Sequence, residues 1–264
     1  MNMLWWQAMV LGLVQGLTEF LPVSSSGHLI LVRELMGLNQ SGSFLLFDVV
    51  VHVGTLVAVL IVLYKDVIAL FKRPFKRLGM LIVATIPAVI VGLTCEDYIS
   101  EYFSTAQYIC FFFLFTAIIM LVSEVVAKHN KDQKDLGWGS AIAMGVMQGV
   151  GVFPGVSRSG STIFGGTVTG AKSKQIATFS FLMSIPVILG SLLFSILDVG
   201  KAGALGSIDW FSLGVGAVTA FVSGYLAIRI MLRLISKANY KWFSAYLLVI
   251  SILTFAFYFL PAVR

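Results

Sequence analysis

The sequence is short of charge. Only 11% of its 264 residues are Asp, Glu, Lys or Arg, whereas about 25% is usual in a soluble domain. Hydrophobic residues make up 58% of the chain, and its mean hydropathy is +0.96. This composition excludes an ordinary soluble protein and predicts an integral membrane protein.

Cysteine is scarce as well, and other signals are missing. The two cysteines, Cys95 and Cys110, match no metal-binding or redox spacing, so we expect inert thiols in the packed interior. No basic segment with a following cleavage site opens the chain, and we expect residues 1–14 to belong to the mature protein. The net charge of +6 comes from basic residues in short loops between apolar runs. Orientation in a membrane explains such loops, and no nucleic-acid partner is expected.

Long apolar runs are what the chain does have. A helix needs about 20 apolar residues to cross a bilayer, and we expect full spans at Phe44–Tyr64, Leu78–Cys95, Gln107–Ala127, Gln175–Leu197, Trp210–Ile228 and Trp242–Leu260. Basic residues gather at 65–77, 128–134 and 229–241, whereas the connection 96–106 holds three acids and no base. Because cytoplasmic loops carry an excess of Lys and Arg, the basic segments are predicted to be cytoplasmic and 96–106 to lie on the opposite face.

Two further apolar stretches are broken at their centres. Pro22 and a Ser-Gly tip interrupt residues 1–42, and Pro154 with a similar tip interrupts residues 137–170. Because neither stretch has arms long enough for a span, we interpret each as a helical hairpin that enters the membrane and returns to the same side. The first is expected to open away from the cytoplasm and the second toward it. The predicted fold is an all-α integral membrane protein with six transmembrane helices plus two re-entrant helical hairpins.

The two hairpins carry related sequences. A shift of 133 positions without a gap aligns identical residues of the two copies: Gln15-Gly16 with Gln148-Gly149, Phe20 with Phe153, Val23-Ser24 with Val156-Ser157, and Ser26-Gly27 with Ser159-Gly160. Elsewhere the copies differ in chemistry: Glu19 against Val152, Ser25 against Arg158, and His28 against Ser161. We interpret residues 1–264 as a single membrane domain built from an inverted-topology repeat, about 1–136 and 137–264, with both tips near the bilayer midplane.

The matched tips are predicted to bind phosphate. Ser- and Gly-rich turns at helix breaks expose backbone N–H groups, and helix N-termini add partial positive charge. Either tip alone could instead be a structural turn, in which small polar residues form hydrogen bonds to the backbone groups that a helix break leaves free. Arg158 follows 22 residues without a charge and suits bidentate phosphate binding, although an ion pair with Glu19 is compatible with this role if the pair opens for substrate. The candidate substrate-binding residues lie on the two tips and the helices before them: Ser24, Ser26, Gly27, Ser157, Ser159, Gly160, Gln15 and Gln148.

Glu19, Ser25 and His28 together supply a carboxylate, a hydroxyl and an acid–base group, as in a generalised catalytic triad. They lie on both sides of the break at Pro22, so they meet only if the chain turns there. A lone histidine is more often a hydrogen-bonded core residue, but beside a serine turn and a carboxylate we favour catalysis.

Asp48 and His52 are four residues apart on one helical face. They fit metal ligands, or groups that orient the hairpin residues or a water at the mouth of the site. We favour the second interpretation for the pair.

The stretches QGLTEFLPVSSSGH (15–28) and PGVSRSG (154–160) resemble the motifs of the bacterial undecaprenyl-pyrophosphate phosphatase family, which is also known for bacitracin resistance. Length and span pattern agree over the whole chain. The resemblance implies a multi-pass enzyme of the bacterial cytoplasmic (inner) membrane that removes the terminal phosphate of undecaprenyl pyrophosphate and so recycles the lipid carrier for peptidoglycan synthesis. Its site would face the periplasm or the outside, and its partners would be the polyprenyl pyrophosphate lipid and the membrane. A homodimer is left open.

By position, the resemblance implies that Ser25 is the nucleophile, His28 the general acid–base group and Arg158 the pyrophosphate clamp. A phospho-histidine at His28 is a competing assignment. Glu19 would bind metal or act in proton transfer.

The resemblance also implies a divalent cation, Mg²⁺ or Ca²⁺. The family has Glu or Gln at the place of Gln15, so this chain lacks a second carboxylate in the motif. The expected metal ligands are therefore Glu19 and Asp48, completed by the diphosphate and water, since hard cations keep phosphate oxygens and waters as ligands.

Two other functions share parts of this pattern. Vanadate-sensitive lipid phosphatases need a nucleophilic histidine downstream of their Ser-Arg motif, but His28, His52 and His129 all precede Arg158. A transporter or flippase of a polyprenyl phosphate lipid remains the alternative, because inverted repeats are typical of transporters.

Overall fold

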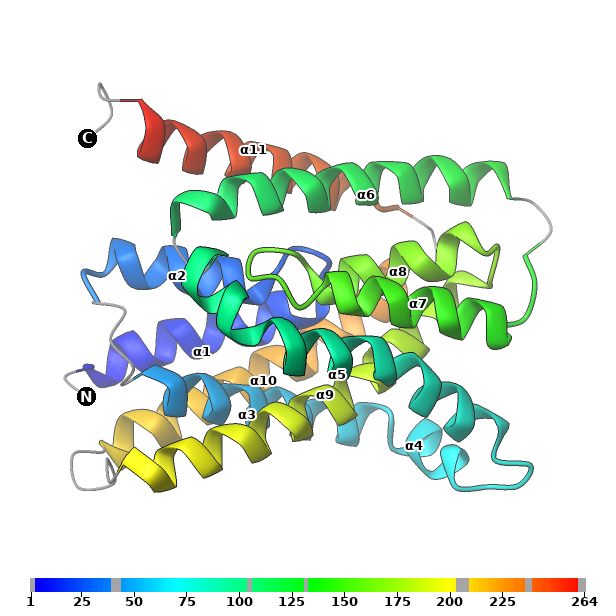
Figure 1. The fold of residues 1–264 in the computed structure, drawn as a ribbon, viewed down its shortest axis with the longest axis horizontal. Helices are drawn as coiled ribbons and strands as arrows, with labels where there is room; N and C mark the ends of the chain where they lie inside the picture. Colours follow the sequence, from blue (N-terminus) through cyan, green and yellow to red (C-terminus); the bar gives the residue numbers. More distant parts are fainter. Residues whose placement is uncertain are drawn as a thin grey trace.

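A computed structural model describes residues 3–38, 44–103, 106–130, 133–202, 209–235 and 239–260. These residues form helices packed side by side (Figure 1). In chain order they are α1 (Trp5–Phe20), α2 (Ser25–Leu35), α3 (Leu45–Val62), α4 (Tyr64–Leu70), α5 (Lys76–Phe103), the 3₁₀ helix η2 (Ala106–Tyr108), α6 (Ile109–His129), α7 (Trp138–Val150), α8 (Arg158–Val168), α9 (Ser173–Ala202), α10 (Trp210–Ile235) and α11 (Lys241–Phe259). Within the described ranges the β-structure is limited to one isolated bridge between Lys134 and Ala171.

Five helices in the described part of the chain are long and apolar enough to cross a membrane: α5, α6, α9, α10 and α11. The pair α3 and α4 would make a sixth, although it is bent by 82°. Large apolar side chains are exposed along these helices, as is expected where the neighbours are lipid tails. The prediction of an all-helical, multi-pass membrane protein is therefore confirmed.

Two expected connections turn out to be partly helical. The connection expected at 96–106 is helical over most of its length, because α5 continues to Phe103, although the apolar span within α5 ends at Cys95 as predicted. The ring of Phe103 packs edge-on against Phe112 and Phe153, which stabilises the last turn. The basic loop predicted at 65–77 begins as α4, whose Leu70 is buried in the core.

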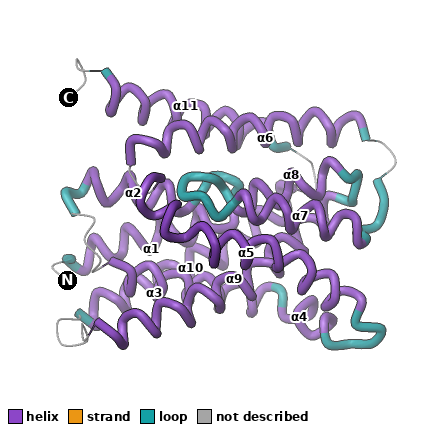
Figure 2. The backbone as a smooth tube through the Cα atoms, in the orientation of Figure 1, coloured by secondary structure: helices purple, strands orange, loops and turns teal. Residues whose placement is uncertain are grey.

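The two broken stretches form pairs of short helices. Figure 1 shows α1 and α2 extending from the centre toward one end of the molecule, and α7 and α8 extending from the centre toward the other. The loops that join each pair lie at the centre (Figure 2). The tips are in contact, since the Ser159 hydroxyl donates to the Leu21 carbonyl at 2.9 Å and the Gly155 N–H donates to Ser26 Oγ at 3.3 Å. The interrupted sequence therefore brings two distant turns to one place.

Glycines allow the hairpin arms to approach neighbouring helices closely. A Cβ atom on Gly12 of α1 would lie 2.4 Å from the Gly216 carbonyl oxygen of α10. A Cβ atom on Gly145 of α7 would lie 2.7 Å from Cα of Ala84 on α5. Small residues at helix interfaces are the usual means of close packing in membranes, and here they fix the arms that carry the tips.

We expect Gly12→Ala to lower the thermal stability of the detergent-purified protein. The added methyl group overlaps the backbone of α10, and overpacking of this kind costs about 1–3 kcal/mol. Gly214→Ala on α10 is the matched control, because a Cβ atom there meets nothing within 4 Å. In the control the higher helix propensity of alanine should leave stability unchanged or raise it. Equal melting temperatures for the two variants would contradict the close α1–α10 contact.

Candidate active site

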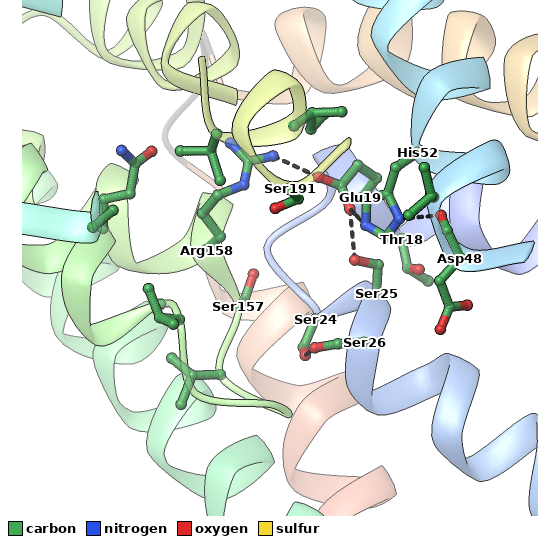
Figure 3. A pocket seen from close by; sticks show the side chains of 18 of the residues that line it. Thr18, Glu19, Ser24, Ser25, Ser26, Asp48, His52, Ser157, Arg158 and Ser191 are labelled. Carbon is green, nitrogen blue, oxygen red and sulfur yellow. Dashed lines mark hydrogen bonds and ion pairs between the residues drawn. The ribbon is translucent and has the colours of Figure 1, made fainter. Parts of the chain in front are cut away.

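A cavity of about 330 Å³ lies at the meeting point of the two tips. Its walls come from the ends of α1 and α7, the starts of α2 and α8, the first turns of α3, and the middle of α5 and α9. The polar lining residues are Thr18, Glu19, Ser24, Ser25, Ser26, Asp48, His52, Gln148, Ser157, Arg158 and Ser191. Figure 3 shows labelled side chains from both hairpins, with Asp48 and His52 of α3 and Ser191 of α9 beside them.

Glu19 is the centre of the polar network. Its Oε2 accepts hydrogen bonds from Ser25 Oγ at 2.6 Å and from Gln15 Nε2 at 3.0 Å, and its Oε1 accepts from Arg158 Nη2 at 2.7 Å (Figure 3). Glu19 is 7% exposed and Arg158 is partly buried. A buried ion pair stabilises a fold little, because desolvation offsets the attraction between the charges. Charges kept at such depth in a membrane protein more often serve a function.

The two serine turns begin their helices in the same way. Ser24 caps α2 by accepting a hydrogen bond from the Gly27 N–H at 3.3 Å, and Ser157 caps α8 by accepting from the Gly160 N–H at 3.0 Å. Ser24 adopts a φ of 70°, which aids the sharp turn into α2. Both helices therefore direct their N-termini to the cavity, where free N–H groups and the helix dipole favour an anion.

Two glycines are required where the tips pass under α6. A Cβ atom on Gly27 would lie 2.6 Å from the ring of Phe113, and one on Gly155 would lie 2.9 Å from Cβ of Phe112. Gly155 also has a φ of 91°, which side-chain-bearing residues rarely adopt. The closeness of α6 explains these glycines without any ligand.

The predicted site residues fall into two groups. Eight of them line the cavity: Glu19, Ser24, Ser25, Ser26, Asp48, Gln148, Ser157 and Arg158. Gln15, Gly27, His28, Ser159 and Gly160 lie outside its lining. Of this second group, Gln15 still contacts the site by donating to Glu19, while Gly160 and Ser159 hold the second tip in place through the bonds given above.

His28 faces away from the cavity. Its Nδ1 lies 2.7 Å from the Ser24 carbonyl oxygen, and its Nε2 lies 2.7 Å from the Tyr246 hydroxyl on α11. The ring also stacks on Tyr246, with 5.7 Å between the ring centroids. Both ring nitrogens are therefore engaged, and His28 supports the serine turn from behind.

His52 on α3 is the histidine that lines the cavity. Its Nδ1 lies 2.6 Å from the Asp48 carbonyl oxygen, an acceptor, so Nδ1 carries a proton and Nε2 is the nitrogen left for the cavity. Nε2 lies 3.7 Å from Glu19 Oε2, the atom that also accepts from Ser25. The spacing of Asp48 and His52 predicted a helical face that orients the hairpin residues, and His52 does lie beside Glu19, although the sequence did not indicate which hairpin residue it would approach.

Thr18, Ser191 and Tyr246 were not predicted as part of the site. Thr18 and Ser191 line the cavity, and Tyr246 contacts His28. Ser191 and Tyr246 lie within ordinary apolar spans, where the sequence carries no signal that separates them from packing residues.

The residues expected to hold a cation do not form a ready-made metal site. The Asp48 carboxylate pairs with both terminal nitrogens of Arg33, and Figure 3 shows it directed away from Glu19. Among the described residues there is no group of three or more His, Cys, Asp or Glu side chains that could hold a metal ion. Buried polar atoms without hydrogen-bond partners do occur nearby, namely Gln15 Oε1, Gln148 Oε1 and Arg158 Nη1. Arg158 Nη1 can donate to a phosphate oxygen, whereas the two amide oxygens can only accept and therefore suit water, a protonated phosphate oxygen or a hydrated cation.

Comparisons with known proteins agree over nearly the whole chain. The family model described as bacitracin resistance protein BacA matches residues 8–253. The undecaprenyl-diphosphatase of Carboxydothermus hydrogenoformans is 40% identical over 248 residues, which cover 93% of this chain and 94% of the relative. That of Halothermothrix orenii is 39% identical over 246 residues, covering 92% and 94%. That of Methanosphaera stadtmanae is 37% identical over 270 residues, covering 94% and 95%.

Proposed function

Because this chain belongs to the bacitracin resistance protein BacA family, we propose that its central cavity is where undecaprenyl diphosphate is hydrolysed to undecaprenyl phosphate and inorganic phosphate. The chain is an undecaprenyl-diphosphatase, in line with the names of its relatives. The observation that carries the assignment to this cavity is the hydrogen-bonded set of Ser25, Glu19 and Arg158, which joins a nucleophile, a base and a phosphate-binding cation from two hairpins.

In the proposed reaction the diphosphate enters between the N-termini of α2 and α8. One terminal nitrogen of Arg158 has no hydrogen-bond partner in the described part of the chain, and the other is released when the Glu19 ion pair opens. The guanidinium can then bind two phosphate oxygens at once. Binding therefore replaces Glu19 by phosphate as the partner of the buried guanidinium, while the Glu19 carboxylate keeps its hydrogen bonds from Ser25 and Gln15.

The opened Glu19 carboxylate is placed to accept the Ser25 proton. Ser25 Oγ forms a bond to the terminal phosphorus, the anhydride P–O bond breaks, and undecaprenyl phosphate leaves with the bond electrons. Water then attacks the phosphoserine, giving inorganic phosphate and restoring the serine. Position and charge neutralisation do most of the work in phosphoryl transfer, and the cavity supplies both through Arg158 and the two helix N-termini.

The role of His28 is proposed to be the positioning of the serine turn. A general acid–base role, or a phospho-histidine, would require Nε2 to leave Tyr246 and the ring to turn toward the cavity. His52, with its Nε2 beside Glu19, needs no such movement to contact the reacting groups.

Tyr246→Phe tests this difference. If His28 acts by holding the Ser24 carbonyl, losing the Tyr246 hydroxyl loosens the ring, and phosphate release should fall about fivefold, the value of roughly one hydrogen bond. If His28 must leave Tyr246 to react, the variant should be as active as wild type or more so. Initial rates of phosphate release in detergent distinguish the two. Tyr64→Phe is the control, because Tyr64 is exposed and starts α4.

We propose that Mg²⁺ or Ca²⁺ arrives bound to the diphosphate, with Glu19 and Asp48 as the nearest carboxylates on this chain. The proposal follows from the absence of a three-ligand cluster among the described residues. No step above is assigned to the cation.

Removal of divalent cations by a chelator should therefore lower the rate of phosphate release without changing the stability of the lipid-free protein. We expect EDTA to stop phosphate release, while Mg²⁺ added without lipid leaves the melting temperature unchanged and shows no saturable binding by calorimetry. Micromolar Mg²⁺ affinity in the absence of lipid would show that a resident metal site exists and would contradict the proposal.

We also propose that the two hairpins are re-entrant and form an inverted repeat in the bacterial inner membrane. Equivalent packing supports this, because Gly12 and Gly145 are 133 positions apart and each lies in close contact with a neighbouring helix. The basic segment 65–77 and the described residues 128–130 and 133–134 adjoin α4, α5 and α7 at one end of the molecule (Figure 1). That end is proposed to be cytoplasmic and the site to open to the periplasm.

Hydrolysis is tested directly by giving the purified protein a polyprenyl diphosphate with Mg²⁺ and measuring phosphate. Release of phosphate together with the monophosphate lipid is expected. Movement of lipid across sealed vesicles without any phosphate release would favour a flippase and overturn the proposed function.

A further inference from the structure

A second cavity, of about 500 Å³, lies beside α4 and the start of α5. In Figure 1 these elements lie at the end of the molecule away from the N-terminus of α1 and the C-terminus of α2. It is formed by α4, the first turns of α5 and α9, and the segment just before α7. None of its lining residues belongs to the catalytic cavity. It is therefore a separate site.

The charges around this cavity are unbalanced. Its lining holds the cations Lys76, Arg77 and Lys174 and the acids Asp66 and Asp135. Arg77 pairs loosely with Asp66, at 3.9 Å. Lys76 and Lys174 have no ion-pair partner among the described residues.

Asp135 does not offset the remaining lysines, because its charge is already matched. Its Oδ1 accepts from Lys172 Nζ at 2.8 Å and from Gln175 Nε2 at 3.0 Å. The Lys172 ammonium and the Gln175 amide hold the pKa of Asp135 below its usual range, so the ion pair persists at neutral pH. The Gln175 side chain also accepts from the Leu136 N–H at 2.6 Å, which fixes this wall of the cavity.

The rest of the lining is apolar and continues into the membrane spans. Met80 on α5 and Phe179 and Leu182 on α9 are each buried. The candidate membrane spans within α5 and α9 begin at Lys76 and Ser173, beside the cavity. The cations Lys76 and Lys174, which have no ion-pair partner among the described residues, thus lie where two apolar spans begin, and the apolar lining lies beside the first turns of those spans.

We propose that this cavity binds an anionic phospholipid, with the phosphate between Lys76 and Lys174 and the first part of an acyl chain against Phe179 and Leu182. Basic pockets between transmembrane helices on the cytoplasmic side commonly hold such headgroups. The N-termini of α5 and α9 add partial positive charge at the same place. A free phosphate ion would match the cations but would make no contact with the apolar part of the lining.

Native mass spectrometry of the detergent-purified full chain tests the proposal. Phosphatidylglycerol is expected to bind in preference to phosphatidylcholine of the same acyl chains and to raise the melting temperature, because a ligand that binds only the folded state stabilises it. The double variant Lys76→Gln/Lys174→Gln should bind phosphatidylglycerol at least tenfold more weakly. The matched double variant Lys65→Gln/Lys72→Gln, which removes the same charge outside the cavity, should bind it within twofold of wild type.

Three results would overturn the proposal. They are equal binding of the two lipids, equal loss of binding in the two double variants, and a rise in melting temperature with millimolar inorganic phosphate as large as that with phosphatidylglycerol. Phosphate release from polyprenyl diphosphate in detergent serves as the folding control, since both double variants should retain it. Because the lipid is measured by mass, its failure to bind is distinguishable from failure of the proposed hydrolysis.

Discussion

Ser25→Ala should abolish phosphate release from a polyprenyl diphosphate, with a loss of more than about 1,000-fold in kcat, as is usual when a nucleophile is removed. The reason is geometric. Ser25 Oγ lies 2.6 Å from the carboxylate that would accept its proton, at the first residue of a helix whose N-terminus faces the cavity. Without this oxygen, water would have to attack the terminal phosphorus directly, although the bound phosphate is oriented for attack by Ser25 Oγ.

The variant should still bind its substrate. Arg158 and the caps of both helices are untouched by removal of the hydroxyl, so the affinity for the diphosphate lipid should stay within a few-fold of wild type. Ser191→Ala is the matched control, because Ser191 lines the same cavity and makes no hydrogen bond in the set around Glu19. It should retain most of the activity.

A second measurement identifies the phosphorylated atom. Rapid acid quench of wild type with labelled substrate should leave label on the peptide that contains Ser25, as an acid-stable phosphoserine. Acid-labile label on His28, or a Ser25→Ala variant that keeps more than a tenth of wild-type activity, would show that serine is not the nucleophile.

The sequence predicted the convergence of the two hairpins correctly, for a clear physical reason. Glu19, Ser25 and Arg158 are costly residues in an apolar chain, and each flanks a helix break that exposes backbone groups. In an apolar environment these polar side chains and free backbone groups need hydrogen-bond partners, and the other break can supply them. The two matched breaks are therefore expected to lie in contact. The matched caps at Ser24 and Ser157 follow from the same 133-residue repeat.

The orientation of the two imidazoles could not be predicted. His28 is three residues from Ser25, close enough along α2 to suggest a shared face, but α11 supplies Tyr246 on the other side of the ring. Tyr246 is 218 positions away in the chain, and no local pattern indicates which side of α2 it covers. His52 reaches Glu19 only because α3 packs beside α1, which is also a tertiary property.

The same limit applies to Asp48. Its carboxylate was expected at the metal, a role that stays a prediction, yet the structure pairs it with Arg33 of α2. Arg33 also lies over the ring of Phe44, with 5.1 Å to the ring centroid. Arg33 lies five residues beyond His28 on α2, and nothing in the sequence indicates that it will pair with this carboxylate.

The proposed role of Arg158 requires both of its terminal nitrogens to bind phosphate oxygens at the same time. Arg158→Ala is a poor test, because it leaves Glu19 buried without its cation, and breaking a buried ion pair from one side costs about 3–5 kcal/mol. Loss of activity in that variant would not be separable from loss of fold.

Arg158→Lys keeps the charge beside Glu19 and removes the planar fork. A lysine offers one ammonium group where Arg158 offers one nitrogen to Glu19 and a second, Nη1, that has no partner among the described residues. We expect a melting temperature close to that of wild type and a fall in kcat/KM of about 100-fold, since two-point phosphate binding adds orientation as well as attraction. The double variant Glu19→Gln/Arg158→Gln, which removes both charges together, should fold and be inactive. If the lysine variant keeps at least a third of the wild-type kcat/KM, a single positive charge is enough at this position, and the substrate phosphate must be oriented by the backbone N–H groups of α2 and α8 instead of the guanidinium.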